Sequence, residues 1–226
     1  MAKKRRFDTT NHVARIFCEA VQAVLQTATD SKITFAPTIQ KVPSISMKPD
    51  IGCFVQFNGD YSGLFIMNLS EKAALELYRR SMLHMGLPEE DLAADYTSDD
   101  VVNCIGEMIN QIIGKARSMV EAEFGLTASN NQPKAITIST AITLSIATTL
   151  ERPQCRRLSF KTQDNNPFYV EMNLEQTEFI QLFPADSSKL NVQQDIDQMI
   201  EGDDPIDDDS TNADDVDIDA LLEEYS

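Results

Sequence analysis

The side chains whose types and spacing could do chemistry lie in the segment GEMINQIIGKAR, which contains Glu107, Asn110 and Gly114. A carboxylate can pair with a cation, and a carboxamide can orient a water molecule. Turned at about 100° per residue, the three positions fall on one side of a helix. This spacing leaves two interpretations open, a solvated helix face or a docking face for a partner, and by spacing alone the solvated face is the more common of the two.

The helix that would position these residues is predicted over residues 98–123. Ser98 can cap its N-terminus, and Asp99 and Asp100 suit the positive end of the helix dipole. Its apolar residues fall on the side opposite Glu107, which places the polar face toward solvent. The apolar stripe consists of Val101, Val102, Ile105, Met108, Ile109, Ile112, Ile113, Ala116, Met119 and Val120.

The glycine on the polar face, Gly114, is unfavourable for helix stability and calls for a specific explanation. A glycine inside a helix costs about 1 kcal/mol relative to alanine. Gly114 faces away from the predicted core, so core packing does not call for it. On a docking face, a glycine would let a partner approach the helix backbone closely.

The remaining hydrophobic pattern predicts an α+β domain in which an antiparallel sheet is packed with long helices. Ser70 can cap the second helix, and Pro37 and Pro43 interrupt the first strand. The predicted helices span residues 10–28, 71–85 and 98–123, and the predicted strands span residues 33–43, 51–58, 63–69, 135–150, 155–162, 167–174 and 177–183.

The net charge of -17 is concentrated at the C-terminal end of the chain. Residues 186–226 hold 15 acidic residues and one basic residue, which leaves a net charge of -3 for residues 1–185. Such a composition cannot bury enough apolar surface to offset chain entropy. We therefore predict a domain over residues 1–184 and an acidic, mostly disordered tail over residues 185–226.

The tail contains two short amphipathic segments. In each segment, three apolar residues recur at the spacing of one helical face. Such segments are too short to hold a helix alone, but they are long enough to fold into a partner's groove. The alternative is a solubilising tail whose apolar residues occur there by chance. The candidate partner-binding residues are Ile196, Met199 and Ile200 in the first segment, and Ile218, Asp219, Leu221 and Leu222 in the second.

Composition excludes several classes of protein. The acidic balance excludes a general nucleic-acid binder, and no run of about 18 apolar residues could span a membrane. The start MAKKRRFDTT lacks an apolar h-region, so we expect no secretory signal and a cytoplasmic protein.

The cysteines and histidines do not pair at the spacing of a metal site, so we expect none in this chain. We expect reduced, mostly buried thiols, and histidines with a structural or surface role. These residues are Cys18, Cys53, Cys104, Cys155, His12 and His84.

The segment around Glu107 resembles the CheX/CheC/FliY family of response-regulator phosphatases. The family signature is Glu-x-x-Asn followed by Gly four residues on, inside a long helix, and Glu107, Asn110 and Gly114 match it. A looser resemblance runs over residues 10–182. CheX is the nearer type, because the signature occurs once here, whereas CheC-type chains carry it twice. The tight match also includes Gly106, Ile113 and Ala116.

The tail carries a second resemblance. The stretch DDVDIDALL resembles the peptide of the flagellar switch protein FliM that binds the chemotaxis regulator CheY, preferentially when CheY is phosphorylated. The stretch QQDIDQMI resembles a weaker second copy. Two independent resemblances, one catalytic and one for docking, imply the same partner.

Together the resemblances imply a chemotaxis-type phosphatase (a hydrolase of two-component signalling) that acts on a phosphorylated CheY-like response regulator. They imply that Asn110 orients the attacking water and that Glu107 engages a lysine beside the phosphate. Mg²⁺ is expected on the regulator, and this chain is expected to bind no cofactor.

Two other functions stay open at this point. The first is a non-catalytic regulator-binding or flagellar-switch adaptor, and the second is an acidic-tailed structural protein unrelated to signalling. CheX-like proteins dimerise through their sheet, so a homodimer through strands 135–150 and 155–174 is a further expectation from the resemblance.

Overall fold

The computed structural model describes residues 9–138, 142–147, 149–150 and 152–175. The predicted strand 177–183, the acidic tail and both of its amphipathic segments lie outside the described residues. The predicted division into a domain and a tail therefore stays a prediction.

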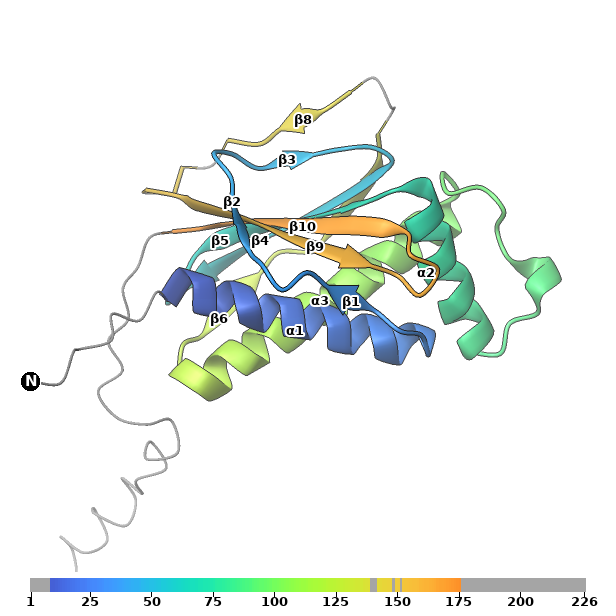
Figure 1. The fold of residues 1–226 in the computed structure, drawn as a ribbon, viewed down its shortest axis with the longest axis horizontal. Coiled ribbons are helices and arrows are strands. Elements are labelled where there is room, and N and C mark those ends of the chain that lie inside the picture. The colour runs from blue at the N-terminus through green and yellow to red at the C-terminus, as the bar shows by residue number, and fades with distance from the viewer. Residues whose placement is uncertain (1–8, 139–141, 148, 151, 176–226) are drawn as a thin grey trace, which may run out of the picture. The chain divides into compact units, whose positions relative to one another are not determined.

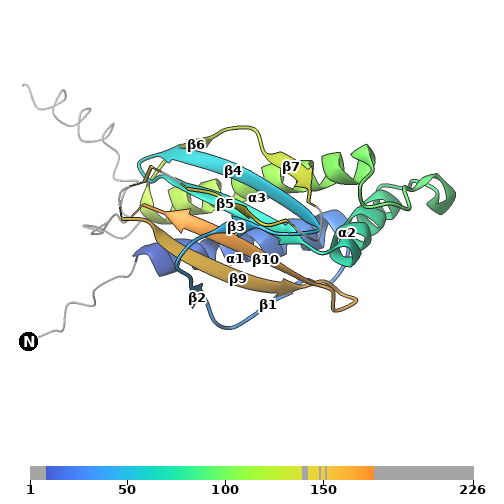
Figure 2. The same ribbon diagram turned by 90° about the horizontal axis from the view of Figure 1, so that it is seen from above.

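An antiparallel sheet forms the centre of the described part of the chain. Its strands follow the order β1-β9-β10-β5-β4-β6, with β2 also pairing with β9 and β7 also pairing with β4 (Figures 1 and 2). The strands are β1 (Thr34–Phe35), β2 (Gln40–Lys41), β4 (Ile51–Gly59), β5 (Gly63–Leu69), β6 (Ala128–Asn130), β7 (Lys134–Thr137), β9 (Gln154–Lys161) and β10 (Pro167–Leu174).

The three long helices of the described chain are α1 (Thr9–Thr29), α2 (Glu71–His84) and α3 (Asp99–Phe124). Helices α1 and α3 pack against each other along one face of the sheet, and α2 lies at one end of it (Figure 1). A 3₁₀ turn, η1 (Glu89–Asp91), stands in the connection between α2 and α3.

The main core lies between the sheet and the helices. Phe17 of α1 lies with its ring centroid 5.7 Å from that of Phe57 and 5.8 Å from that of Phe65, which joins α1 to β4 and β5. Burying a side chain of this size contributes about 1.5–3 kcal/mol. The periodic apolar residues of the two helices therefore fix both helices to one side of the sheet.

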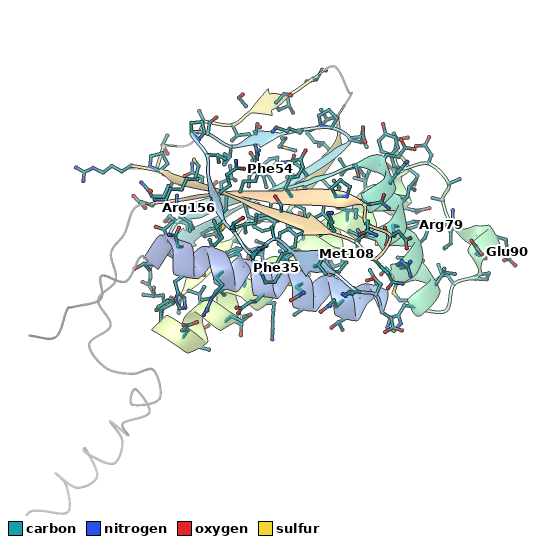
Figure 3. All side chains as sticks on the ribbon, in the orientation of Figure 1. Phe35, Phe54, Arg79, Glu90, Met108 and Arg156 are labelled. Carbon is teal, nitrogen blue, oxygen red and sulfur yellow. The ribbon has the colours of Figure 1, made fainter. Side chains whose placement is uncertain are left out.

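The other face of the sheet carries a second, smaller layer. Strands β3 (Ser46–Met47) and β8 (Leu144–Ser145) pair with each other there, and Phe54 lies on this side of the sheet (Figure 3). The side chain of Glu171 is buried beneath this layer. It accepts hydrogen bonds from Arg157 Nε at 2.8 Å and from the Ser46 backbone N–H at 2.7 Å. Because both carboxylate oxygens have partners, the buried charge is tolerated and ties β3 to the sheet.

Helix α2 is held by a second carboxylate, Glu76, which is also buried. It accepts hydrogen bonds from Asn166 Nδ2 at 2.8 Å and from the Asp164 backbone N–H at 3.0 Å, and the Thr162 hydroxyl also donates to it. Arg80 Nε donates to it from the next turn of α2 at 3.3 Å. The turn between β9 and β10 therefore fixes where α2 lies.

Most predicted elements are confirmed. The hairpin predicted over 51–58 and 63–69 is the antiparallel pair β4–β5. The predicted cap of α2 is also present, since Ser70 Oγ accepts from the Ala73 N–H at 3.3 Å. The predicted helices correspond to α1, α2 and α3, and the predicted strands 155–162 and 167–174 correspond to β9 and β10.

The prediction of one strand over residues 135–150 is wrong. β7 pairs with β4 in the large sheet, whereas β8 pairs with β3 in the small layer. A high content of β-branched residues favours extended backbone but does not say which neighbour a strand will pair with. The predicted strand 33–43 likewise divides at Pro37 into β1 and β2. The homodimer that is expected to form through the sheet stays a prediction.

The cysteines and histidines are placed as expected. All four cysteines are free thiols, with Cys18, Cys53 and Cys155 buried and Cys104 half-buried. His12 packs edge-on against the ring of Phe124 and contacts Glu123. None of the described helices is both long enough and apolar enough to cross a membrane.

Replacing Ser98 should destabilise the chain, because Ser98 Oγ accepts a hydrogen bond from the Val101 N–H at the start of α3. We expect Ser98→Ala to lower the free energy of unfolding by about 1 kcal/mol in urea denaturation. Ser118→Ala, at an exposed position inside the same helix, is the matched control and should leave stability unchanged or slightly higher. Equal losses in the two variants would contradict the assigned cap.

Candidate functional site

Helix α3 carries the three signature residues on its exposed side. Glu107, Asn110 and Gly114 are exposed, whereas Met108 and Ile112 on the opposite side are buried. The structure therefore brings the three predicted residues together on adjacent turns, and we call this surface the α3 ridge. Its direction is fixed by the buried stripe and by the two ends of the helix.

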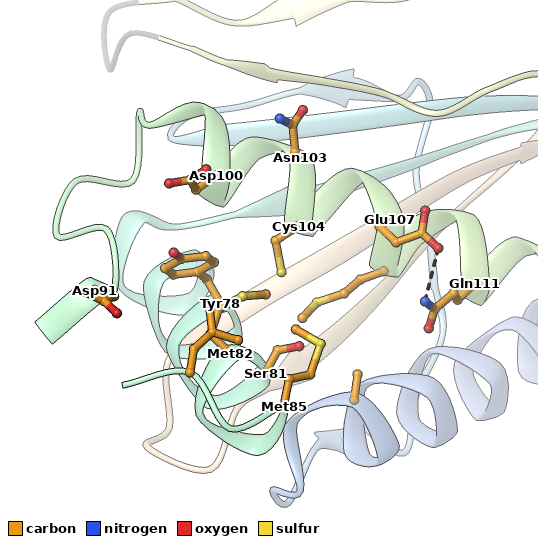
Figure 4. Close-up of a pocket in the computed structure, with 13 residues that line it drawn as sticks. Tyr78, Ser81, Met82, Met85, Asp91, Asp100, Asn103, Cys104, Glu107 and Gln111 are labelled. Atoms are coloured by element: carbon orange, nitrogen blue, oxygen red, sulfur yellow. Dashed lines mark hydrogen bonds between the residues drawn. The ribbon is translucent and has the colours of Figure 1, made fainter. Parts of the chain in front are cut away.

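The carboxylate of Glu107 is supported by its own helix. Gln111 Nε2, one turn further on, donates a hydrogen bond to Glu107 Oε1 at 3.1 Å (Figure 4). A carboxylate held in this way loses less side-chain freedom when it meets a partner's cation.

Gly114 stands in open space. A Cβ built at this position meets no heavy atom within 4 Å outside the backbone of its own turn of helix. At Gly63, by contrast, a Cβ would lie 2.5 Å from the Asn173 carbonyl oxygen. Packing inside the chain therefore requires glycine at residue 63 but not at residue 114.

A groove of about 490 Å³ lies beside the ridge, between α2 and α3 (Figure 4). Tyr78, Met82 and Met85 line it from α2 and from the residue that follows α2. Glu107 borders the groove, so it is continuous with the ridge. We call it the α2–α3 groove.

A second groove of about 320 Å³ lies on the other side of the ridge, between α3 and β7. Asn110 and Glu107 border it from the helix, and Lys134 and Ile136 border it from the strand. The ridge therefore stands between two hollows, and Glu107 borders both of them.

The groove residues that sequence reasoning missed come from α2 and from the residues after it. The prediction treated 71–85 only as an amphipathic helix next to the core. One signal was present, because Met85 and Leu87 are apolar residues on either side of the helix-ending Gly86. What the pattern could not show is that α2 would pack beside the N-terminal half of α3.

The thiol in the α2–α3 groove is a poor nucleophile. Burial raises the pKa of Cys104 to about 11, although a hydrogen bond with Ser81 opposes the rise. At neutral pH the thiol therefore stays protonated. Within the described ranges, no group of three or more His, Cys, Asp or Glu side chains could hold a metal ion.

The ridge offers a carboxylate and a carboxamide on a protruding surface, open to water. Catalytic groups in such a place cannot exclude water or concentrate charge alone. They can contribute to a reaction only when another molecule closes over them. The geometry therefore suits half of a composite site, in which the reacting group arrives on a partner.

Comparison with protein families and solved structures identifies a matching family and similar folds. A model of the family described as "Protein of unknown function (DUF3334)" matches residues 4–226. The fold is similar to that of the chemotaxis protein CheX from Desulfovibrio desulfuricans, with a TM-score of 0.60 and 22% identity over 73% of this chain and 99% of that one.

Two further structures share the fold. One is the CheX–CheY–BeF₃–Mg²⁺ complex from Borrelia burgdorferi, with a TM-score of 0.54 and 15% identity over 72% of this chain and 97% of that one. The other is FliY from Thermotoga maritima, with a TM-score of 0.54 and 14% identity over 76% and 91% of the two chains. The predicted CheX/CheC-like α+β fold is confirmed, and no curated protein matches the chain by sequence.

Gly114 should be replaceable without loss of stability. We expect Gly114→Ala to raise the free energy of unfolding by up to about 1 kcal/mol, because alanine restricts the unfolded chain and meets no obstacle in the fold. Gly125→Ala, at the left-handed end of α3 with φ 69°, is the contrasting variant and should lower it. Thermal or urea unfolding measures both, and a destabilised Gly114→Ala would show that the fold itself requires the glycine.

Proposed function

The chain belongs to the family of proteins of unknown function DUF3334, and we propose that it is a phosphatase that hydrolyses the aspartyl phosphate of a CheY-like response regulator. One observation carries the proposal. Glu107 and Asn110 stand one turn apart on an exposed ridge, next to a glycine that the fold does not need.

The fold favours this function over the alternative that Glu107 and Asn110 only form a solvated helix face. The CheX/CheC-like fold is present, and the solved complex from Borrelia burgdorferi pairs a CheX of the same fold with CheY, BeF₃ and Mg²⁺. The signature residues of the family resemblance occupy the long helix of that fold on its solvent side.

Asn110 is assigned to the attacking water. In hydrolysis of an aspartyl phosphate, water attacks phosphorus in line with the bond to the aspartate oxygen. That bond breaks and the regulator recovers its carboxylate. The water oxygen leaves in hydrogen phosphate with one of its protons, and the other proton passes to solvent. The carboxamide can accept a hydrogen bond from the water and hold it in line, so that its contribution is positioning.

Glu107 is assigned to a lysine of the regulator that lies beside the phosphate. A carboxylate–ammonium pair is a charge-assisted hydrogen bond, and it fixes the register of the two proteins as they meet. The hydrogen bond from Gln111 holds the carboxylate in place for this contact. Gly114 lets the regulator's backbone approach α3 further along the ridge.

The metal ion belongs to the regulator in this proposal. Mg²⁺ bound there would neutralise charge on the phosphoryl group, and this chain supplies the carboxamide and the carboxylate. The protein partner therefore brings the substrate, the metal ion and the lysine, and closes the site.

The tail has a role in the same proposal. Its two amphipathic segments, around Ile196 and Ile218, would hold the regulator on a tether. A tether of this kind can raise the local concentration of substrate into the millimolar range, about 1 mM for short linkers. The segments then affect capture of the regulator and not the chemical step.

Decay of the phosphorylated regulator tests the catalytic assignment. We expect the protein to accelerate dephosphorylation of a CheY-like receiver, and Asn110→Ala to lower that acceleration about 100-fold or more. Glu107→Gln should lower kcat/KM by about 10- to 100-fold, because the charge-assisted contact is lost.

Glu19→Gln is the control, since Glu19 is a half-buried helix carboxylate on α1 that lines neither groove. It should leave the decay rate unchanged. Binding of the phosphorylated regulator without faster decay would overturn the catalytic assignment and leave a regulator-binding adaptor.

Substitutions in the tail should separate capture from chemistry. We expect Ile218→Ala combined with Leu221→Ala to raise KM for the phosphorylated regulator about tenfold while kcat stays unchanged. Val192→Ala, an apolar tail residue outside both segments, is the control. An unchanged KM in the double variant would leave the tail with a solubilising role only.

A further inference from the structure

Large apolar side chains are exposed where α2 ends, next to the α3 ridge. Leu83 is 45% exposed, Met85 is 60% exposed and Leu87 is 40% exposed. Met85 and Leu87 line the α2–α3 groove, whereas Leu83 lies outside its lining. Two of the three therefore extend one hollow beside Glu107.

The walls of this groove are apolar and rich in methionine, whose side chain is adaptable. Met82 and Met85 line it together with Tyr78 (Figure 4). Met108 lines it from α3. Methionine is unbranched and polarizable, so a surface rich in it can adapt to the side chain that it receives.

The mouth of the groove is acidic. Asp91, Asp100 and Glu107 border it, and its lining, which consists of described residues, contains no lysine, arginine or histidine. A cationic segment is attracted to such a mouth, and an acidic one is repelled. The chain's own acidic tail, with 15 acidic residues and one basic residue in 186–226, is therefore a poor occupant.

The groove and the ridge form one continuous surface. Glu107 belongs to both, and Asn103, one turn before it, borders the groove on the same helix. A partner that places a phosphoryl group at Asn110 and a lysine at Glu107 already touches one border of the groove. No separate binding event is needed to reach it.

We propose that the α2–α3 groove is a specificity surface for the same response regulator, and that it receives an apolar side chain flanked by lysine or arginine. The inference rests on the proposed function and names the chemistry of the partner. The ridge would act on any aspartyl phosphate that reaches it, and the groove would select which regulator reaches it. Changes in the groove should alter affinity and KM, and should leave kcat at saturation unchanged.

Affinity for a stable mimic of the phosphorylated regulator tests the groove. The probe is a CheY-like receiver loaded with BeF₃⁻ and Mg²⁺, and full-length protein is titrated against it. We expect Met85→Gln combined with Leu87→Gln to raise Kd about tenfold or more. Leu83→Gln is the matched control, exposed to a similar degree but outside the groove, and should stay within about twofold of the wild type.

A charge variant tests the acidic mouth separately. Asp91→Asn should raise Kd and weaken the dependence of Kd on salt, because one attraction across the mouth is lost. Glu90→Gln, an exposed neighbour on the same 3₁₀ turn that does not line the groove, is its control. Equal effects of the two variants would show only a general loss of negative charge. That result would contradict a specific attraction between the acidic mouth of the groove and the regulator.

Methionine methyl NMR identifies the occupant. With ¹³C-methyl methionine, adding the loaded regulator should shift the signals of Met82, Met85 and Met108, while those of Met67 and Met172, which are fully buried in the core, stay in place. If Ile196→Asp shifts the Met85 signal in the free chain, the tail fills the groove. If dilution of the free chain shifts it, a second copy does. Either result overturns the proposal.

The two proposals fail in different ways. If the wild type accelerates dephosphorylation of the regulator but the Met85/Leu87 variant has an unchanged Kd, the groove inference is wrong and the phosphatase proposal stands. If that variant has a raised Kd but the wild type does not accelerate dephosphorylation, the phosphatase proposal is wrong and the groove is a regulator-binding surface. If the loaded regulators of the source organism all fail to bind, both proposals fall.

Discussion

Burial of one side of α3 is the interaction on which the rest of the site depends. Most of its stripe of apolar residues, from Val101 to Val120, is buried against α1 and the sheet. Each large side chain in such a stripe contributes about 1.5–3 kcal/mol. Rotating the helix would expose several of them at once, so the buried stripe fixes the direction in which the ridge faces. Ser98 and Gly125 fix where this rigid segment begins and ends.

A rigid ridge that faces water can serve only a partner-completed reaction. Glu107 and Asn110 lie outside any enclosed cavity, so they cannot create the dry, low-dielectric surroundings that strengthen charge interactions. Docking of a second protein would supply that enclosure. The same exposure explains why the flanking grooves matter, because they enlarge the surface over which a partner can exclude water.

The helices and the ridge could be predicted because they depend on local sequence. Periodicity predicts α3, and Ser98 marks its start. The α2–α3 groove could not be predicted, since it arises where two helices meet and where Glu76 anchors α2 to a distant turn. The error over residues 135–150 has the same origin: local propensity for extended backbone says nothing about the layer in which Leu144 will pair.

Several local departures from maximal stability lie on one surface of the described chain. Gly114 gives up about 1 kcal/mol of helix stability where nothing crowds it. Met85 and Leu87 expose apolar surface instead of burying it, and Asp91 and Asp100 gather like charges at one groove mouth. Folding alone gives no reason for any of these choices. They share one explanation if this surface is covered during function, because a partner would approach Gly114, bury the apolar groups and neutralise the acids.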